Sequence, residues 1–162
     1  MGILFQDKKI GLALLCDNAP YTLAMTLASY ERTGLLDYLD AACVVYPEGG
    51  GKVEHTARVC GIPAVPSSME GGFVGALATA VTTLDTDYVL LAEDDCMVWE
   101  HLRGETLEKQ LKQALGLLVS GQADMVRLRH AWRGSTRYKA AYTYSYFYPV
   151  EQPVSYTHLR AH

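Results

Sequence analysis

The sequence has no apolar run approaching the ~18 consecutive residues that a membrane-spanning helix needs. Its first residues also lack the basic region, apolar stretch and cleavage site of a secretory signal. Both absences argue against a membrane or secreted protein. We therefore expect a cytoplasmic protein without a transmembrane segment.

Cysteine is scarce and widely spaced. The four cysteines, Cys16, Cys43, Cys60 and Cys96, form no CxxC pair and have no histidine at ligand spacing. This pattern predicts neither a zinc site nor a disulfide framework. We expect all four to be reduced, partly buried, small apolar side chains.

Positive charge is also limited. The formal net charge is −4 and the pI is about 5.7, so no global basic field is present to attract a nucleic acid, and we expect no nucleic-acid partner. The basic cluster of Arg127, Arg129 and His130 could contact a diphosphate or an anionic acceptor, because guanidinium groups match phosphate oxygens. The same residues could equally be solvated at a strand end.

What the chain does have is the composition of a folded domain. Its 162 residues are 49% hydrophobic and 20% charged, which is close to the average of globular proteins. We expect residues 1–153 to form a single domain, since domains usually span ~100–200 residues. Residues 154–162 lack the preceding periodicity and resemble translated sequencing-adapter read-through, so we expect a non-native tail there.

Strand and helix patterns alternate along the chain. Apolar runs predict strands over residues 10–16, 42–46, 61–65, 88–92 and 124–129, and helical patterns occupy residues 20–34, 52–60, 73–84 and 105–119. Asp17 or Asn18 is expected to cap the first helix, which would bury Leu23, Leu27 and Tyr30. Such alternation predicts an α/β fold with a mainly parallel sheet and helices on both of its faces.

Three acids in a row, Glu93-Asp94-Asp95, follow the apolar run 88–92, which we expect to be a central, buried strand. Ligands of open parallel sheets lie outside the carboxyl ends of the strands. Adjacent carboxylates repel one another unless a cation balances them, and Mg²⁺ or Mn²⁺ prefers such oxygen ligands together with substrate phosphates. The alternative is that the acids cap the next element or face water.

The segments LLCDNAPYTLAMTLASYERTG, VVYPEGG and TDYVLLAEDD, within residues 8–130, resemble the nucleotide-diphospho-sugar glycosyltransferases of the Rossmann-like GT-A fold. The acidic triplet is similar to the DxD motif of that family in its EDD form. The resemblance implies that Asp95, with Asp94, binds Mn²⁺ or Mg²⁺. It also implies donor-binding roles for Glu93 and Asp94 near the sugar and ribose, and for Asp17, Asn18 and Glu48 near the base.

The sequence departs from the family pattern in two places. The loop after the first strand, Asp17-Asn18-Ala19-Pro20, offers no cation for the phosphates. The segment that would supply the acceptor site and a general base is missing, so we expect a C-terminally truncated chain and identify no catalytic residue.

The function implied by the resemblance is metal-dependent transfer of a sugar from a nucleotide-diphosphate donor, a UDP-sugar, to an acceptor hydroxyl. The acceptor would be a glycan or another hydroxyl compound. Two alternatives remain open: a non-catalytic nucleotide- or carbohydrate-binding module, and a sugar-phosphate nucleotidyltransferase.

Overall fold

The computed structural model describes residues 7–98, 104–128 and 154–156. The chain divides into two compact units, Met1–Leu107 and Glu108–His162, and each is described by itself. The elements in chain order are β1 (Ile10–Leu15), α1 (Pro20–Thr33), η1 (Leu35–Tyr38), β2 (Ala41–Pro47), α2 (Gly51–Val59), β3 (Ala64–Ser67), η2 (Met69–Gly71), α3 (Gly72–Thr83), β4 (Tyr88–Glu93), α4 (Glu105–Val119), β5 (Val126–Leu128) and β6 (Val154–Tyr156).

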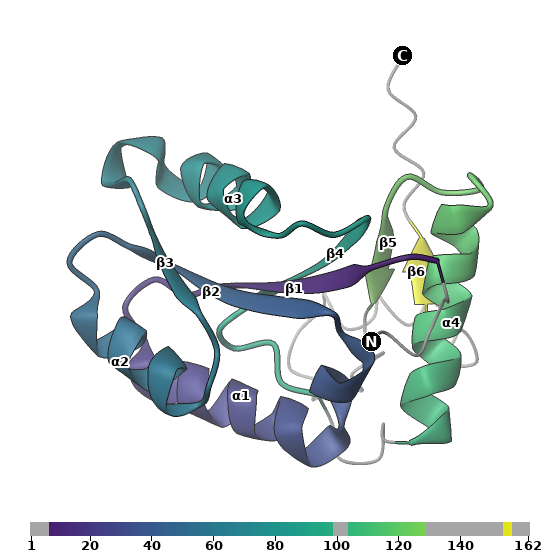
Figure 1. Ribbon diagram of the computed structural model, residues 1–162, viewed down its shortest axis with the longest axis horizontal. Helices are drawn as coiled ribbons and strands as arrows, with labels where there is room; N and C mark the ends of the chain where they lie inside the picture. Colours follow the sequence, from purple (N-terminus) through teal and green to yellow (C-terminus); the bar gives the residue numbers. More distant parts are fainter. Residues whose placement is uncertain (1–6, 99–103, 129–153, 157–162) are drawn as a thin grey trace, which may run out of the picture. The chain divides into compact units, whose positions relative to one another are not determined.

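The first unit is built on a four-stranded sheet in the order β3-β2-β1-β4. All three pairings are parallel, and Leu15 of β1 lies in register with both Val45 of β2 and Glu93 of β4. Helices α1 and α2 lie on one face of the sheet and α3 on the other (Figure 1). The predicted α/β fold with a parallel sheet and helices on both faces is confirmed.

Burial explains why β1 is the apolar run without alternation. All six of its residues are buried, because strands flank both of its edges and helices cover both of its faces. Leu15 and Val45 belong to the core on the α3 side, with Ala80 and Leu84 of the α3 region. On α1, Leu23, Leu27 and Tyr30 are buried as predicted.

The prediction that residues 88–92 form a central, buried strand is wrong for the part of the chain that the structure describes. Strand β4 pairs with β1 alone and forms an edge of the sheet, where Leu91 is 44% exposed. The chain reaches this edge because it crosses from β3 back past β2 and β1. The strand predicted at 124–129 forms as β5, which pairs with β6 in a separate antiparallel ladder rather than in the parallel sheet.

The start of α1 also differs from the prediction. Its N-cap is Ala19, and no side chain caps the helix, so neither Asp17 nor Asn18 has the predicted capping role. Pro20 occupies the first turn and thereby fixes the cap at Ala19, whose carbonyl accepts the N–H of Leu23 at 3.0 Å. Both polar side chains are exposed.

The second unit contains most of α4, whose bounds match the predicted helix, and the β5–β6 pair. Strand β6 falls within the residues that we expected to be a non-native tail. In the ranges that the structure describes, no helix has the length and apolar character to cross a membrane.

Replacing Gly34 by alanine should destabilise the fold by about 1 kcal/mol, because Gly34 ends α1 at a φ of +73°, a region that a Cβ atom disfavours. Gly51→Ala is the matched control. Gly51 begins α2 without a positive φ, and an added Cβ would meet no atom within 4 Å. Urea unfolding should show a loss for Gly34→Ala and no loss for Gly51→Ala. Equal midpoints would contradict this account of the helix end.

Candidate functional site

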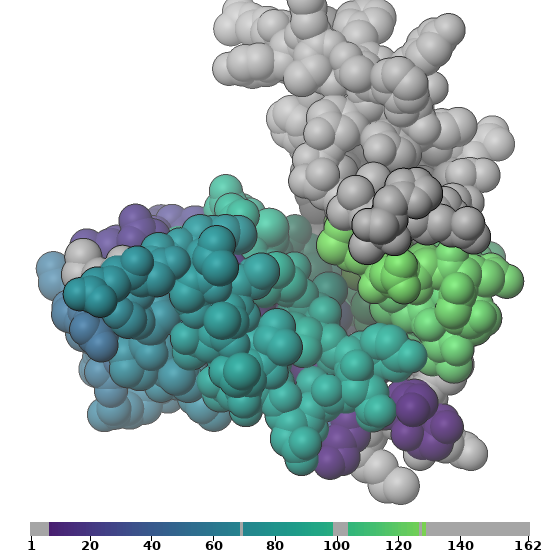
Figure 2. All heavy atoms as spheres, turned by 90° about the horizontal axis from the view of Figure 1, so that it is seen from above, coloured from purple at the N-terminus to yellow at the C-terminus, as the bar shows by residue number. Residues whose placement is uncertain are grey.

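A pocket of about 410 Å³ lies at the carboxyl ends of the four parallel strands. Figure 2 looks onto the α3 face of the first unit, where the teal residues of α3 and its flanking segments form much of the surface. The pocket is lined by residues from all four strand ends and from the start of α3: Leu15, Cys16, Asp17, Val45, Tyr46, Pro47, Ser67, Ser68, Gly72, Phe73, Ala76, Glu93 and Asp94. Its size is typical of small-molecule sites.

The position of the pocket follows from the strand order. The chain moves outward from β1 to β2 and β3, then returns to pair β4 with the other edge of β1. This reversal leaves a crevice between the loops that follow β1 and β4. The pocket lies at the edge of the sheet where the sequence predicts a ligand site, and the binding of a ligand there stays a prediction.

The three acids span the end of β4 and the turn that follows it: Glu93 is the last residue of the strand, and Asp94 and Asp95 begin the turn. The N–H of Asp94 donates to the Leu15 carbonyl at 3.0 Å, which continues the β1–β4 ladder by one residue. The N–H of Cys96 then donates to the Glu93 carbonyl, also at 3.0 Å, and closes the turn. Asp94 and Asp95 therefore leave the sheet at the level where β1 ends, directly after Glu93.

Polar side chains of α1 hold this acidic turn, which we define as residues 93–98. The Thr26 hydroxyl donates to the Asp94 carbonyl, and the Tyr30 hydroxyl donates to the Cys96 carbonyl at 2.7 Å. Ser29 Oγ accepts the N–H of Val98 at 3.0 Å. The sequence pattern predicted only an apolar stripe on this helix face and gave no indication of these contacts. Thr26 and Ser29, the hydroxyl residues that interrupt the stripe, were the available signal.

A thiol contacts one of the acids inside the pocket. Cys16 Sγ lies 3.3 Å from Asp94 Oδ2 and donates to it. Burial is the main reason that the pKa of the Cys16 thiol rises to about 12, and the neighbouring Asp94 carboxylate raises it further. The thiol therefore remains protonated at neutral pH and can keep donating to Asp94.

The structure brings some of the predicted donor-binding residues together. Asp17, Glu93 and Asp94 line the pocket, whereas Asn18, Glu48 and Asp95 are exposed and do not appear among its lining residues. Arg129 and His130 lie outside the described residues, as does the side chain of Arg127. No group of three or more potential ligands that could hold a metal occurs within the described ranges.

The remaining walls combine aromatic and hydroxyl side chains that the sequence patterns did not predict as site residues. Phe73 is 62% exposed at the start of α3, while Tyr46 is buried and donates its hydroxyl to Glu54 Oε2 at 3.1 Å. Ser67 is buried and donates to the Tyr46 carbonyl at 3.3 Å. Tyr46 and Ser67 lie at the carboxyl ends of β2 and β3, on the other side of β1 from the acidic turn.

The four cysteines are free in the structure. Cys16 and Cys43 are buried, whereas Cys60 and Cys96 are exposed, so the prediction of partly buried cysteines holds for two of them. No disulfide joins them, as the spacing predicted.

No protein-family model matches the sequence, and no curated protein matches it. Among solved structures, a nucleotidyl transferase from Methanothermobacter thermautotrophicus aligns with 67% of this chain at 13% identity and a TM-score of 0.45, and the chain spans only 57% of its length. A phosphoribosylglycinamide formyltransferase from Anaplasma phagocytophilum aligns with 94% of this chain and 67% of its own, at 13% identity and a TM-score of 0.39. Neither likeness is strong enough to indicate an activity.

Iodoacetamide should modify Cys16 more slowly than Cys60 in the folded protein, by more than about tenfold at pH 8, because only the thiolate reacts and Cys16 is both buried and protonated. Cys60 is the internal reference because its side chain is exposed. Mass spectrometry of tryptic peptides gives both rates. Comparable rates for Cys16 and Cys60 in the folded protein would contradict the buried thiol–carboxylate contact. In denaturant, the alkylation rates of the two thiols should become equal.

Proposed function

We propose that this chain binds the nucleotide-sugar donor of a metal-dependent glycosyltransferase, with the acidic turn and a divalent ion facing the donor's diphosphate. The observation that carries the proposal is the pocket of about 410 Å³ at the strand ends, into which two of the three successive acids face. The donor is a UDP-sugar and the acceptor a hydroxyl group of a glycan or similar compound.

The charge of the pocket supports a metal ion. Asp17, Glu93 and Asp94 are acidic, and no basic side chain occurs among the lining residues. A diphosphate would be repelled by these carboxylates, so its binding requires a cation between them. The N-terminus of α3, which no side chain caps, adds the positive end of a helix dipole at the same pocket.

Asp95 and Asp94 are the proposed ligands of Mn²⁺ or Mg²⁺, as the resemblance to the EDD motif implies. Asp95 is exposed, and its one described side-chain contact is a weak 3.8 Å approach of Cys96 Sγ to Oδ1. Two carboxylates on one turn fit an ion that completes its shell with phosphate oxygens and water. The bound ion would stabilise the negative charge on the departing diphosphate.

The opposite wall suits the nucleoside. Phe73 offers an exposed ring on which a base can stack, and the hydroxyls of Ser67 and Ser68 offer hydrogen bonds. Asn18 and Glu48 follow β1 and β2 at the same edge of the sheet and remain proposed base contacts. Arg127, Arg129 and His130 remain proposed contacts for phosphate or acceptor.

UDP together with Mn²⁺ should raise the thermal midpoint of the purified chain, because a ligand at 100 times its Kd stabilises the native state by about 2.7 kcal/mol. Neither UDP nor Mn²⁺ alone should do so, and GDP and CDP give the base preference. Asp95→Asn should abolish the shift without lowering the midpoint of the free protein, because Asp95 is exposed.

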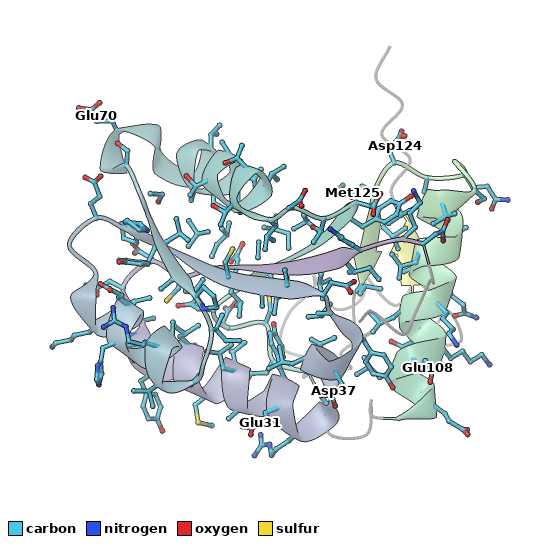
Figure 3. The ribbon with its side chains drawn as sticks, in the orientation of Figure 1. Glu31, Asp37, Glu70, Glu108, Asp124 and Met125 are labelled. Atoms are coloured by element: carbon cyan, nitrogen blue, oxygen red, sulfur yellow. The ribbon has the colours of Figure 1, made fainter. Side chains whose placement is uncertain are left out.

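Asp37→Asn is the matched control. Asp37 is also exposed, but it lies after α1 near the amino ends of the strands, far from Glu70 at the carboxyl ends (Figure 3). The variant should retain the full shift with UDP and Mn²⁺. A shift that survives in Asp95→Asn, or no shift in a folded wild type, would contradict the proposed donor site.

The reaction products separate the proposal from its alternatives. A glycosyltransferase site should slowly hydrolyse a UDP-sugar to UDP and free sugar when no acceptor is present. A sugar-phosphate nucleotidyltransferase would instead release a nucleoside triphosphate when given the nucleotide sugar and pyrophosphate. A non-catalytic module would bind the ligand and yield neither product.

A further inference from the structure

We propose that three hydroxyl side chains on the buried face of α1, those of Thr26, Ser29 and Tyr30, are positioning residues that fix the acidic turn for the donor and its metal. The part that concerns the donor rests on the function proposed above. The hydrogen bonds that these side chains make to the turn do not depend on that function.

The three side chains bind successive main-chain groups of the turn. Thr26 donates to the carbonyl of Asp94, Tyr30 donates to that of Cys96, and Ser29 accepts the N–H of Val98. Residues spaced i, i+3 and i+4 share one face of a helix, so the three groups act as one surface. Their contacts extend along the turn from Asp94 to Val98.

These contacts determine where Asp95 lies. Thr26 fixes the peptide group that enters Asp95, and Tyr30 fixes the peptide group that follows Cys96. The Asp95 side chain is exposed, and the one hydrogen bond described for it is the 3.8 Å approach of Cys96 Sγ to Oδ1. The orientation of its carboxylate therefore depends on main-chain restraints supplied by α1.

The location of the turn makes such restraints necessary. Within the described residues β4 has β1 as its sole ladder partner, so only one side of the strand holds the main chain that leads to the acids. The neighbouring carboxylates also repel one another. Thr26, Ser29 and Tyr30 are each 2% exposed or less, and a buried hydroxyl that loses its partner is costly, so the contacts resist release.

Thr33 provides a matched control on the same helix. It is also a buried threonine, 3% exposed, but its hydroxyl donates to the carbonyls of Ser29 and Tyr30 within α1. It has no contact with the acidic turn among the described hydrogen bonds. Thr26→Val and Thr33→Val therefore remove the same hydroxyl from similar surroundings, and only the first releases the turn.

The experiment compares these two variants by amide hydrogen exchange across residues 94–98 and by the Kd for UDP with saturating Mn²⁺. Thr26→Val should exchange faster across the turn, by about tenfold, and its Kd for UDP should rise by a similar factor. Thr33→Val should match the wild type in both readouts. Tyr30→Phe, which removes only a hydroxyl, should repeat the Thr26→Val result and replaces it if that variant does not fold.

Each outcome decides the proposal. Equal exchange across the turn in Thr26→Val and Thr33→Val would overturn it, and so would faster exchange that leaves the Kd for UDP unchanged. If the wild type does not bind UDP with Mn²⁺, the proposed donor site fails. The exchange comparison then still decides whether α1 holds the turn, so the two failures are distinguishable.

Discussion

The parallel pairing of β1 with a strand on each side is the constraint on which the rest of the first unit depends. Because β2 and β4 occupy both of its edges, β1 must be buried on both faces, which requires α1 and α2 on one side and α3 on the other. The same pairing sets Leu15 level with Glu93, so the loops after β1 and β4 leave the sheet together. The pocket and the acidic turn both follow from that shared level.

Burial of α1 against the sheet then couples the helix to the turn. Its apolar residues Leu23 and Leu27 contribute to the core, while the hydroxyls of Thr26 and Tyr30 on the same buried face bind the main chain after β4. One helix face thus provides both hydrophobic stabilisation and the hydrogen bonds of a loop far away in sequence. A turn that carries three adjacent carboxylates can keep its shape under this arrangement.

Much of this fold could be predicted from the sequence, because continuous apolar runs and helical periodicity are local signals. They placed β1, β2, β4 and the intervening helices close to their observed bounds. They could not give the strand order, so β4 was wrongly expected at the centre of the sheet. The prediction that Asp17 caps the first helix was wrong, because Pro20 fixes the cap at Ala19. Asp17 lines the pocket instead.

The candidate site was predictable where acids follow a strand, and less so where the site depends on contacts between distant segments. Glu93 and Asp94 were predicted in this way, whereas Ser67, Phe73, Thr26 and Cys16 reach the site only through the three-dimensional fold.

We propose above all that a metal-bound nucleotide occupies this pocket. Paramagnetic broadening of amide NMR signals by Mn²⁺ tests it most directly: with UDP present, broadening should concentrate at residues 93–97 and 16–17. Broadening that is scattered over other surface acids, or that does not change when UDP is added, would contradict the account.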